Sequence, residues 1–245
     1  MSWILGYRKR TGFRKHGGDS NLQRYRQLNS NLCIPAIPEI KKALALILAT
    51  SIGPDGGINP SKDIEQSDVC INGMFLNYGY YFGTDEEKLR SVVDFIVSQQ
   101  LADGGFNCRL NRSGARHSSM HSTISVLEGI REYIVAGYAF RAEELKRIEG
   151  EAQEFLLRHR LFKSDHTGAV IHPIFLKLVY PPRWRYDILR ALDYFQSVGY
   201  PYDERLQDAL DILKEKRLSD GRWKTQAHHP GEVHFQMEQA GKPSR

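Results

Sequence analysis

Four short turns rich in aspartate and glycine divide this 245-residue chain into intervals of similar length. They read PDGG at 54–57, DGGF at 103–106, DHTG at 165–168 and DGRW at 220–223, and their aspartates are 48, 62 and 55 residues apart. Glycine permits the positive φ that ends a helix, and an aspartate side chain can bind the backbone amides of a turn. A period of roughly 50 residues that contains two helices is typical of a helical repeat array.

Between the turns, apolar residues recur at the helical spacing of three and four, as Leu89, Val92 and Ile96 do. No convincing run of strands interrupts this pattern. The segments predicted to be helical are 38–50, 68–83, 84–101, 117–138, 142–162, 182–199 and 203–218. The chain is therefore predicted to form one all-α domain over 31–245, preceded by a basic arm over 1–30.

The net charge of +5 is concentrated in that arm, where residues 1–26 hold seven Lys or Arg and one Asp. The remainder of the chain is close to neutral, so a nucleic-acid-binding domain is not expected. Interleaved with aromatic residues, the arm could touch an anionic membrane surface. A solvated or packed extension is the alternative.

The longest apolar run, 43–52, is about half the ~20 residues that a membrane-spanning helix needs. The three cysteines are scattered and odd in number, which indicates reduced thiols rather than a disulfide framework. These features together predict a cytoplasmic protein.

The motifs SQQLADGGFNC at 98–108 and KEKRLSDGRWK at 214–224 give the fold prediction its detail. They resemble the Gln-x-x-Asp-Gly-Trp/Phe motifs of squalene–hopene and oxidosqualene cyclases, whose α/α toroid architecture is shared by the β subunits of protein prenyltransferases. The stretch 67–224 is also similar to bacterial proteins labelled squalene-cyclase-like. The resemblance implies a ring of helical hairpins whose inner helices line a central cavity, and an apolar, isoprenoid-type ligand in that cavity.

The chain departs from these relatives in two respects. It lacks the Asp-x-Asp-Asp motif with which class II cyclases protonate their substrate, and it has no clear Asp-x-Cys pair like that of the prenyltransferase zinc site. A complete toroid also needs about twelve helices, more than are predicted here. An incomplete ring, a smaller ring and closure by a second copy of the chain, as a homo-oligomer, all stay open.

If alternate helices are the inner ones, their polar residues should form stripes that face the cavity. The first inner helix then aligns Cys70, Met74, Asn77 and Tyr81, with Asn72 near its start. The second aligns His117, His121, Ser125 and Glu128, and the third aligns Arg183, Asp187, Arg190 and Tyr194.

His117 and His121 are four residues apart, a spacing at which two imidazoles on a helix can bind one metal ion. Cys70, Cys108, His172 or Glu128 could complete a zinc site. Without a second clustered pair, surface or hydrogen-bonded histidines are the competing interpretation. Acid–base chemistry is the other hypothesis, with Glu128 polarising one of the histidines.

Arg183 and Asp187 are also four residues apart, so they could form a simple ion pair on an exposed helix. The alternative is functional: Arg183 would bind an anionic group such as a diphosphate, and Asp187 would donate a proton. The candidate catalytic residues are therefore His117, His121, Glu128, Arg183 and Asp187.

Aromatic side chains could line an apolar cavity and stabilise a carbocation through their π faces, although aromatic residues at helical spacing more often form a core. The candidate ligand-binding residues are Cys70, Asn72, Asn77, Tyr81, Ser125, His172, Trp184 and Tyr186. The leading hypothesis is a protein that binds, and as an enzyme transforms, an isoprenoid-type ligand. A non-catalytic repeat module for a lipid, peptide or protein is one alternative, and a carbohydrate-active toroid enzyme is another.

Overall fold

The computed structural model describes residues 38–61, 64–180, 182–227, 229 and 239–244. Within these residues the regular structure is helical, with isolated bridges in place of strands, which confirms the all-α class. The predicted arm over 1–30 lies outside the described residues. The described chain divides into two compact units, an N-terminal unit up to Phe155 and a C-terminal unit from Leu156. The single domain over 31–245 stays a prediction.

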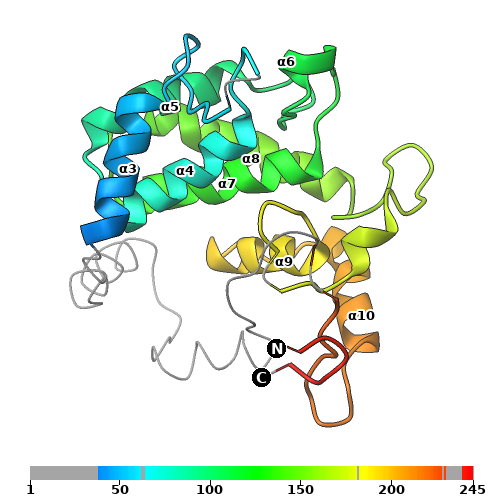
Figure 1. Cartoon of the computed structure of the whole chain (residues 1–245). Coiled ribbons are helices and arrows are strands. Elements are labelled where there is room, and N and C mark those ends of the chain that lie inside the picture. The colour runs from blue at the N-terminus through cyan, green and yellow to red at the C-terminus, as the bar shows by residue number, and fades with distance from the viewer. Residues whose placement is uncertain (1–37, 62–63, 181, 228, 230–238, 245) are drawn as a thin grey trace. The chain divides into compact units, whose positions relative to one another are not determined.

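The N-terminal unit consists of helices joined by connections of different lengths (Figure 1). The helices are α3 (Pro38–Thr50), α4 (Val69–Tyr81), α5 (Glu86–Ser98), the short α6 (Leu110–Ser113), α7 (Met120–Val135) and most of α8 (Ala142–Arg158). The longest connections precede α4 and α6. α5 buries the apolar stripe predicted from its sequence, including Leu89, Val92 and Ile96. α8 buries Leu145, Ile148 and Ala152 on a matching stripe, so both helices cover the core with one face.

Helices α4 and α7 pack on each other in the centre of this unit (Figure 1). A Cβ atom added to Gly129 of α7 would lie 2.3 Å from the Gly73 carbonyl oxygen of α4, and one added to Gly73 would lie 2.5 Å from the Ser125 carbonyl oxygen. Distances this short mean that the two backbones touch. Glycine at both positions is what permits the contact.

The two helices run in the same direction. Near their starts, Cys108 Sγ lies 3.3 Å from both the Cys70 backbone nitrogen of α4 and the Ser122 hydroxyl of α7. Near their ends, the Tyr138 ring packs edge-on against Tyr80 of α4 and Tyr133 of α7. These contacts show that α4 and α7 are parallel neighbours that start side by side.

The aspartate–glycine turns share one hydrogen-bonding pattern. The backbone nitrogens of Gly53, Leu101 and Leu218 each donate to the carbonyl oxygen four residues ahead, at 2.8, 3.0 and 2.7 Å. The turn at 165–168 is one residue longer, with Ser164 donating to Ala169 at 2.8 Å. The first, second and fourth predicted turns are thus equivalent elements, and the third differs from them in length.

Two of the turns are also fixed to the helix that follows them in the same way. Asp55 accepts hydrogen bonds from the Ser67 backbone nitrogen and hydroxyl, and Asp103 accepts the same pair from Ser118. Ser67 and Ser118 each lie two residues before the first residue of α4 and α7, respectively. Five residues after each serine, a buried side chain binds the turn: Asn72 accepts from the Ile58 nitrogen at 2.6 Å, and Thr123 from the Phe106 nitrogen at 3.0 Å.

The turn at 54–57 with α4 and the turn at 103–106 with α7 are therefore equivalent, because the same hydrogen bonds join turn and helix in both. The side chains that repeat are Asp, Ser and then Asn or Thr, and they direct α4 and α7 away from equivalent turns. This common origin explains why the two helices start side by side and run in parallel.

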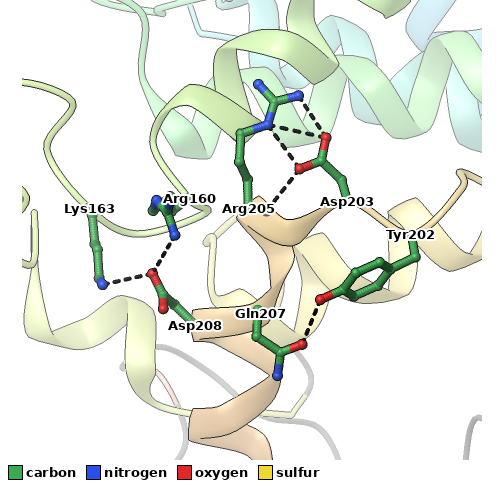
Figure 2. A network of polar contacts seen from close by, with 7 residues as sticks. All are labelled: Arg160, Lys163, Tyr202, Asp203, Arg205, Gln207 and Asp208. Carbon is green, nitrogen blue, oxygen red and sulfur yellow. Dashed lines mark hydrogen bonds and ion pairs between the residues drawn. The ribbon is translucent and has the colours of Figure 1, made fainter.

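The C-terminal unit contains η1 (Pro173–Leu176), α9 (Ile188–Ser197), η2 (Glu204–Leu206) and α10 (Gln207–Glu215). Its core includes the fully buried Tyr186, whose hydroxyl donates to the Leu161 carbonyl and whose ring packs edge-on against Phe175 at 5.0 Å. α10 is attached to the chain that follows α8 by Asp208, whose Oδ2 binds Lys163 at 2.8 Å and Arg160 at 3.2 Å (Figure 2). These contacts are partly exposed and position the helix rather than form a site.

Candidate functional site

The half-exposed surfaces of α4 and α7 form one continuous face. On a helix each residue advances the side-chain direction by about 100°. Seen down its axis, α4 turns its partly exposed side chains about a quarter turn away from Gly73. α7 turns its partly exposed side chains about a quarter turn away from Gly129 in the opposite rotational sense. Because the helices are parallel, these two directions coincide in space.

We name this surface the α4–α7 face. Its α4 members are Cys70, Met74, Asn77, Tyr78 and Tyr81, and its α7 members are His121, Glu128 and Glu132. All are half-buried except the two tyrosines, which are exposed. Five residues that the sequence predicts for a site, Cys70, Asn77, Tyr81, His121 and Glu128, are brought together here.

Aromatic and carboxylate side chains occupy different helices of this face. Tyr78 and Tyr81 are 52% and 49% exposed, and they lie about one turn apart on α4. On α7, Glu128 and Glu132 are also one turn apart. The pKa of Glu132 is raised by burial and by the negative charge of Glu128, against the opposing effect of Arg131. Burial thus favours the protonated form of the Glu132 carboxyl.

Sequence reasoning missed Glu132, although the signal was available. It continues the spacing of His121, Ser125 and Glu128 by four residues, and the predicted helix extended well beyond it. The predicted stripe simply stopped one turn too early.

Three other predicted residues of the N-terminal unit, His117, Asn72 and Ser125, lie outside the α4–α7 face. His117 precedes α7, which begins at Met120, so the predicted helical His117–His121 pair is wrong. His117 is exposed, in a segment held by the Ser118–Asp103 and Ser119–Phe106 hydrogen bonds. Asn72 is fully buried against the turn at Ile58.

Ser125 is buried where α7 touches α4, and its hydroxyl donates to the His121 carbonyl at 3.1 Å. It is therefore part of the helix contact rather than of the α4–α7 face. Within the residues that the structure describes, no group of three or more His, Cys, Asp or Glu side chains is arranged to hold a metal ion.

The remaining predicted residues belong to the C-terminal unit, where the helix expected from residue 182 begins only at Ile188. Arg183 lies in the preceding turn with a φ of 55°, so the predicted helical stripe from Arg183 through Asp187 is wrong. Asp187 is instead the N-cap of α9 and accepts a hydrogen bond from the Arg190 nitrogen at 2.8 Å. This capping geometry stops the helix from extending toward Arg183.

Asp187 is only 4% exposed, and burial raises its pKa to about 6. Hydrogen bonds from the backbone of Arg190, Val179 and Leu189, and the charge of Arg190, act in the opposite direction. The carboxyl therefore titrates near neutral pH, but its acceptor positions are used in joining α9 to the segment before it.

Arg183 takes part in a cationic cluster with Lys177 and Arg185. Burial and then the charges of Arg185, Arg183 and Lys177 lower the pKa of His229, which is 9% exposed. Trp184 is 45% exposed and stacks under the Arg185 guanidinium at 4.6 Å.

The other two predicted ligand-binding residues of this unit have structural roles. Tyr186 is part of the core, as described above. His172 is exposed, and its Nδ1 caps η1 by accepting from the Ile174 nitrogen at 3.1 Å.

No described helix is both long and apolar enough to cross a membrane. Comparison of the chain with protein-family models, with curated proteins and with solved structures gives no match. The case for function therefore depends on the residues and contacts of the chain itself.

Proposed function

We propose that this chain is a toroid-type helical repeat protein, akin to the squalene-cyclase-like and protein prenyltransferase architecture, and that it binds an apolar isoprenoid-type ligand on the α4–α7 face. One observation carries the proposal: α4 and α7 share a partly exposed surface that has aromatic rings on one helix and carboxyls on the other. Tyr78 and Tyr81 lie one turn apart on this surface, so together they offer an apolar contact to a ligand.

The shape of the face supports a long, narrow ligand. Cys70, Met74, Asn77 and Tyr81 follow one side of α4 over eleven residues, or roughly 17 Å at the helical rise. Met74 is a flexible thioether, and the tyrosines offer flat apolar rings with a polar edge. This combination suits a linear hydrocarbon chain better than the dense hydroxyl groups of a sugar.

The face also contains the groups needed to act on such a ligand. A protonated Glu132 can transfer its proton to an alkene carbon, which leaves a carbocation that the π faces of Tyr78 and Tyr81 would stabilise. Loss of a proton from a neighbouring carbon to the Glu132 carboxylate would complete an isomerisation or cyclisation. Within the proposal, Glu132 takes the role of the missing Asp-x-Asp-Asp acid.

Calorimetric titration with farnesol, squalene and a maltooligosaccharide tests the proposal. We expect an isoprenoid to bind and the double variant Tyr78→Ala/Tyr81→Ala to weaken that binding at least about tenfold, since each buried ring contributes on the order of 1 kcal/mol. Tyr202→Ala is the matched control, because Tyr202 is 68% exposed in the C-terminal unit. Equal affinity of wild type and double variant, or binding of the sugar alone, would overturn the proposal.

A further inference from the structure

Cys70 and Cys108 are 38 positions apart in the sequence and meet at the start of α4. Cys108 directly follows the 103–106 turn, and its backbone nitrogen donates to the Ser122 hydroxyl at 3.1 Å. Its Sγ accepts from the Cys70 backbone nitrogen at 3.3 Å and from the Ser122 hydroxyl at 3.3 Å. The Cys70 thiol hydrogen-bonds to the same sulfur. Both thiols are free and half-buried.

The two thiols differ in how readily they ionise. Hydrogen bonds from the Cys70 thiol, the Ser122 hydroxyl and the Cys70 amide lower the pKa of Cys108 to about 7, against the effect of burial. The pKa of Cys70 is raised well above its usual range, first by its hydrogen bond to Cys108 and then by burial. Cys108 is therefore the thiol of the pair that ionises more readily, and its thiolate is the nucleophilic form.

The dielectric surroundings alone would give the opposite result for Cys108. Burial ordinarily makes a thiol less acidic. The three donors that converge on one sulfur, one of them the amide of the second residue of α4, account for the difference.

We propose that Cys70 and Cys108 form a redox site that a hydroperoxide converts reversibly into a disulfide. This inference is independent of the proposed isoprenoid ligand. It adds to the protein a second, covalent chemistry at the end of the α4–α7 face where Cys70 lies.

The reaction balances in two steps. The Cys108 thiolate attacks one peroxide oxygen; an S–O bond forms, the O–O bond breaks, and the leaving alkoxide or hydroxide takes up a proton. Cys108 is then a sulfenic acid. The Cys70 sulfur attacks the Cys108 sulfur, an S–S bond forms, the S–O bond breaks, and the oxygen leaves as water with the Cys70 proton. The two thiols are oxidised by two electrons, and the peroxide is reduced.

Because the Cys108 sulfur lies 3.3 Å from the backbone nitrogen of Cys70, the second thiol is next to the site of the first step. The bond would join the 103–108 turn covalently to α4. A disulfide across such a loop is expected to stabilise the oxidised unit, and a dithiol reductant reverses the step by thiol–disulfide exchange.

The test uses the full chain with Cys33→Ser as background, since Cys33 lies outside the described residues. The background protein, and the same protein with Cys70→Ser, Cys108→Ser or Ser122→Ala, are exposed to hydrogen peroxide at neutral pH and followed by intact-mass and peptide mass spectrometry. Far-UV circular dichroism of each variant verifies that it is folded before peroxide is added.

We expect the background protein to lose two hydrogens, to yield one peptide pair joined through Cys70 and Cys108, and to regain its mass with dithiothreitol. With Cys70→Ser, a cyclic diketone should trap a sulfenic acid at Cys108. With Cys108→Ser, no disulfide can form, and oxidation of Cys70 should be at least about tenfold slower than that of Cys108 in the Cys70→Ser protein. Burial still raises the pKa of the Cys70 thiol, and the donors that converge on the Cys108 sulfur do not bind the Cys70 sulfur. Ser122→Ala should slow the first step but still give the disulfide.

Two results would overturn the proposal. One is accumulation of sulfinic acid at Cys108 in the background protein without a disulfide. The other is oxidation of Cys70 in the Cys108→Ser protein at a rate equal to or higher than that of Cys108 in the Cys70→Ser protein. All the substituted side chains are small. If one variant fails to fold, the disulfide of the background protein and the oxidation rates of the other variants still test the proposal.

Discussion

Replacing Gly129 by alanine tests the direct backbone contact between α4 and α7. The new Cβ would lie 2.3 Å from the Gly73 carbonyl oxygen, 3.0 Å from its carbonyl carbon and 3.2 Å from its Cα. All three atoms are backbone, so no side chain can rotate away. The helices must separate by about 1 Å to restore an ordinary contact distance, and overpacking of this kind costs typically 1–3 kcal/mol.

The helix propensity of alanine acts in the opposite direction. Alanine is the better helix former by about 1 kcal/mol, so the substitution would be stabilising if the helix were free. With the overpacking cost near its upper end, we expect Gly129→Ala to lower the free energy of unfolding of the N-terminal unit by about 2 kcal/mol.

Gly150→Ala measures the opposing effect alone. Gly150 is a helical, exposed glycine of α8 in the same unit, and a Cβ there would have nothing within 4 Å. It should raise the free energy of unfolding by up to about 1 kcal/mol. Urea unfolding followed by circular dichroism, with equal slopes for both variants, gives the two values.

The reasoning is refuted if Gly129→Ala is as stable as wild type or more stable while Gly150→Ala is stabilising. That result would mean that α4 and α7 are not in backbone contact. The parallel pair, and with it the α4–α7 face, would then have to be abandoned.

Three further predictions concern the turns and caps. The pKa of Asp187 is raised from 3.8 to about 6, so the folded protein holds this proton more tightly than the unfolded chain, and its contribution to stability falls as pH rises through that window. Asp187→Asn removes this dependence, so its unfolding free energy relative to wild type should increase between pH 4 and pH 7 by at most about 3 kcal/mol in urea titrations. Ser118→Ala removes one hydrogen bond to the Asp103 carboxylate and should lower the unfolding free energy by about 1.5–3 kcal/mol, while no loss would show that the turn is held otherwise. Arg160 has a φ of 43°, so Arg160→Gly should raise the thermal midpoint by an amount equivalent to about 0.5–1 kcal/mol despite the loss of its exposed contact with Asp208; a lower midpoint would contradict a strained backbone.

Much of the fold could be predicted because its determinants are local. The turns need glycine at positive φ, as at Gly104 with a φ of 94°, and an aspartate to bind nearby amides. At Gly104 a Cβ would also lie 2.8 Å from the Glu151 carbonyl oxygen. α5 was predictable because its apolar spacing matches the side that it buries. These requirements are visible in a single stretch of sequence.

The starts of α7 and α9 were mispredicted, whereas those of α3 and α8 agree with the prediction. His117 and Arg183 both precede stretches of good helical periodicity, and periodicity alone cannot distinguish a lead-in from a first turn. In the folded chain, Asp103 holds the segment around Ser118, and Asp187 caps α9. The meeting of Cys70 with Cys108 depends in the same way on how α4 and α7 pack, which no local pattern records.

The part of the site that could be predicted is the part that follows one helix. Cys70, Asn77 and Tyr81 share a face because α4 is a regular helix, and His121 and Glu128 share one on α7. That the two stripes form a single surface depends on the Gly73–Gly129 contact, which only the structure provides.

Photo-crosslinking with a diazirine-bearing farnesyl probe, followed by peptide mass mapping, tests the central claim most directly. The account predicts that labelled peptides come from α4 and α7, that Tyr78 and Tyr81 are among the labelled residues, and that unlabelled farnesol competes. Labelling confined to exposed apolar residues elsewhere, such as Val170 and Ile171 of the C-terminal unit, would contradict it.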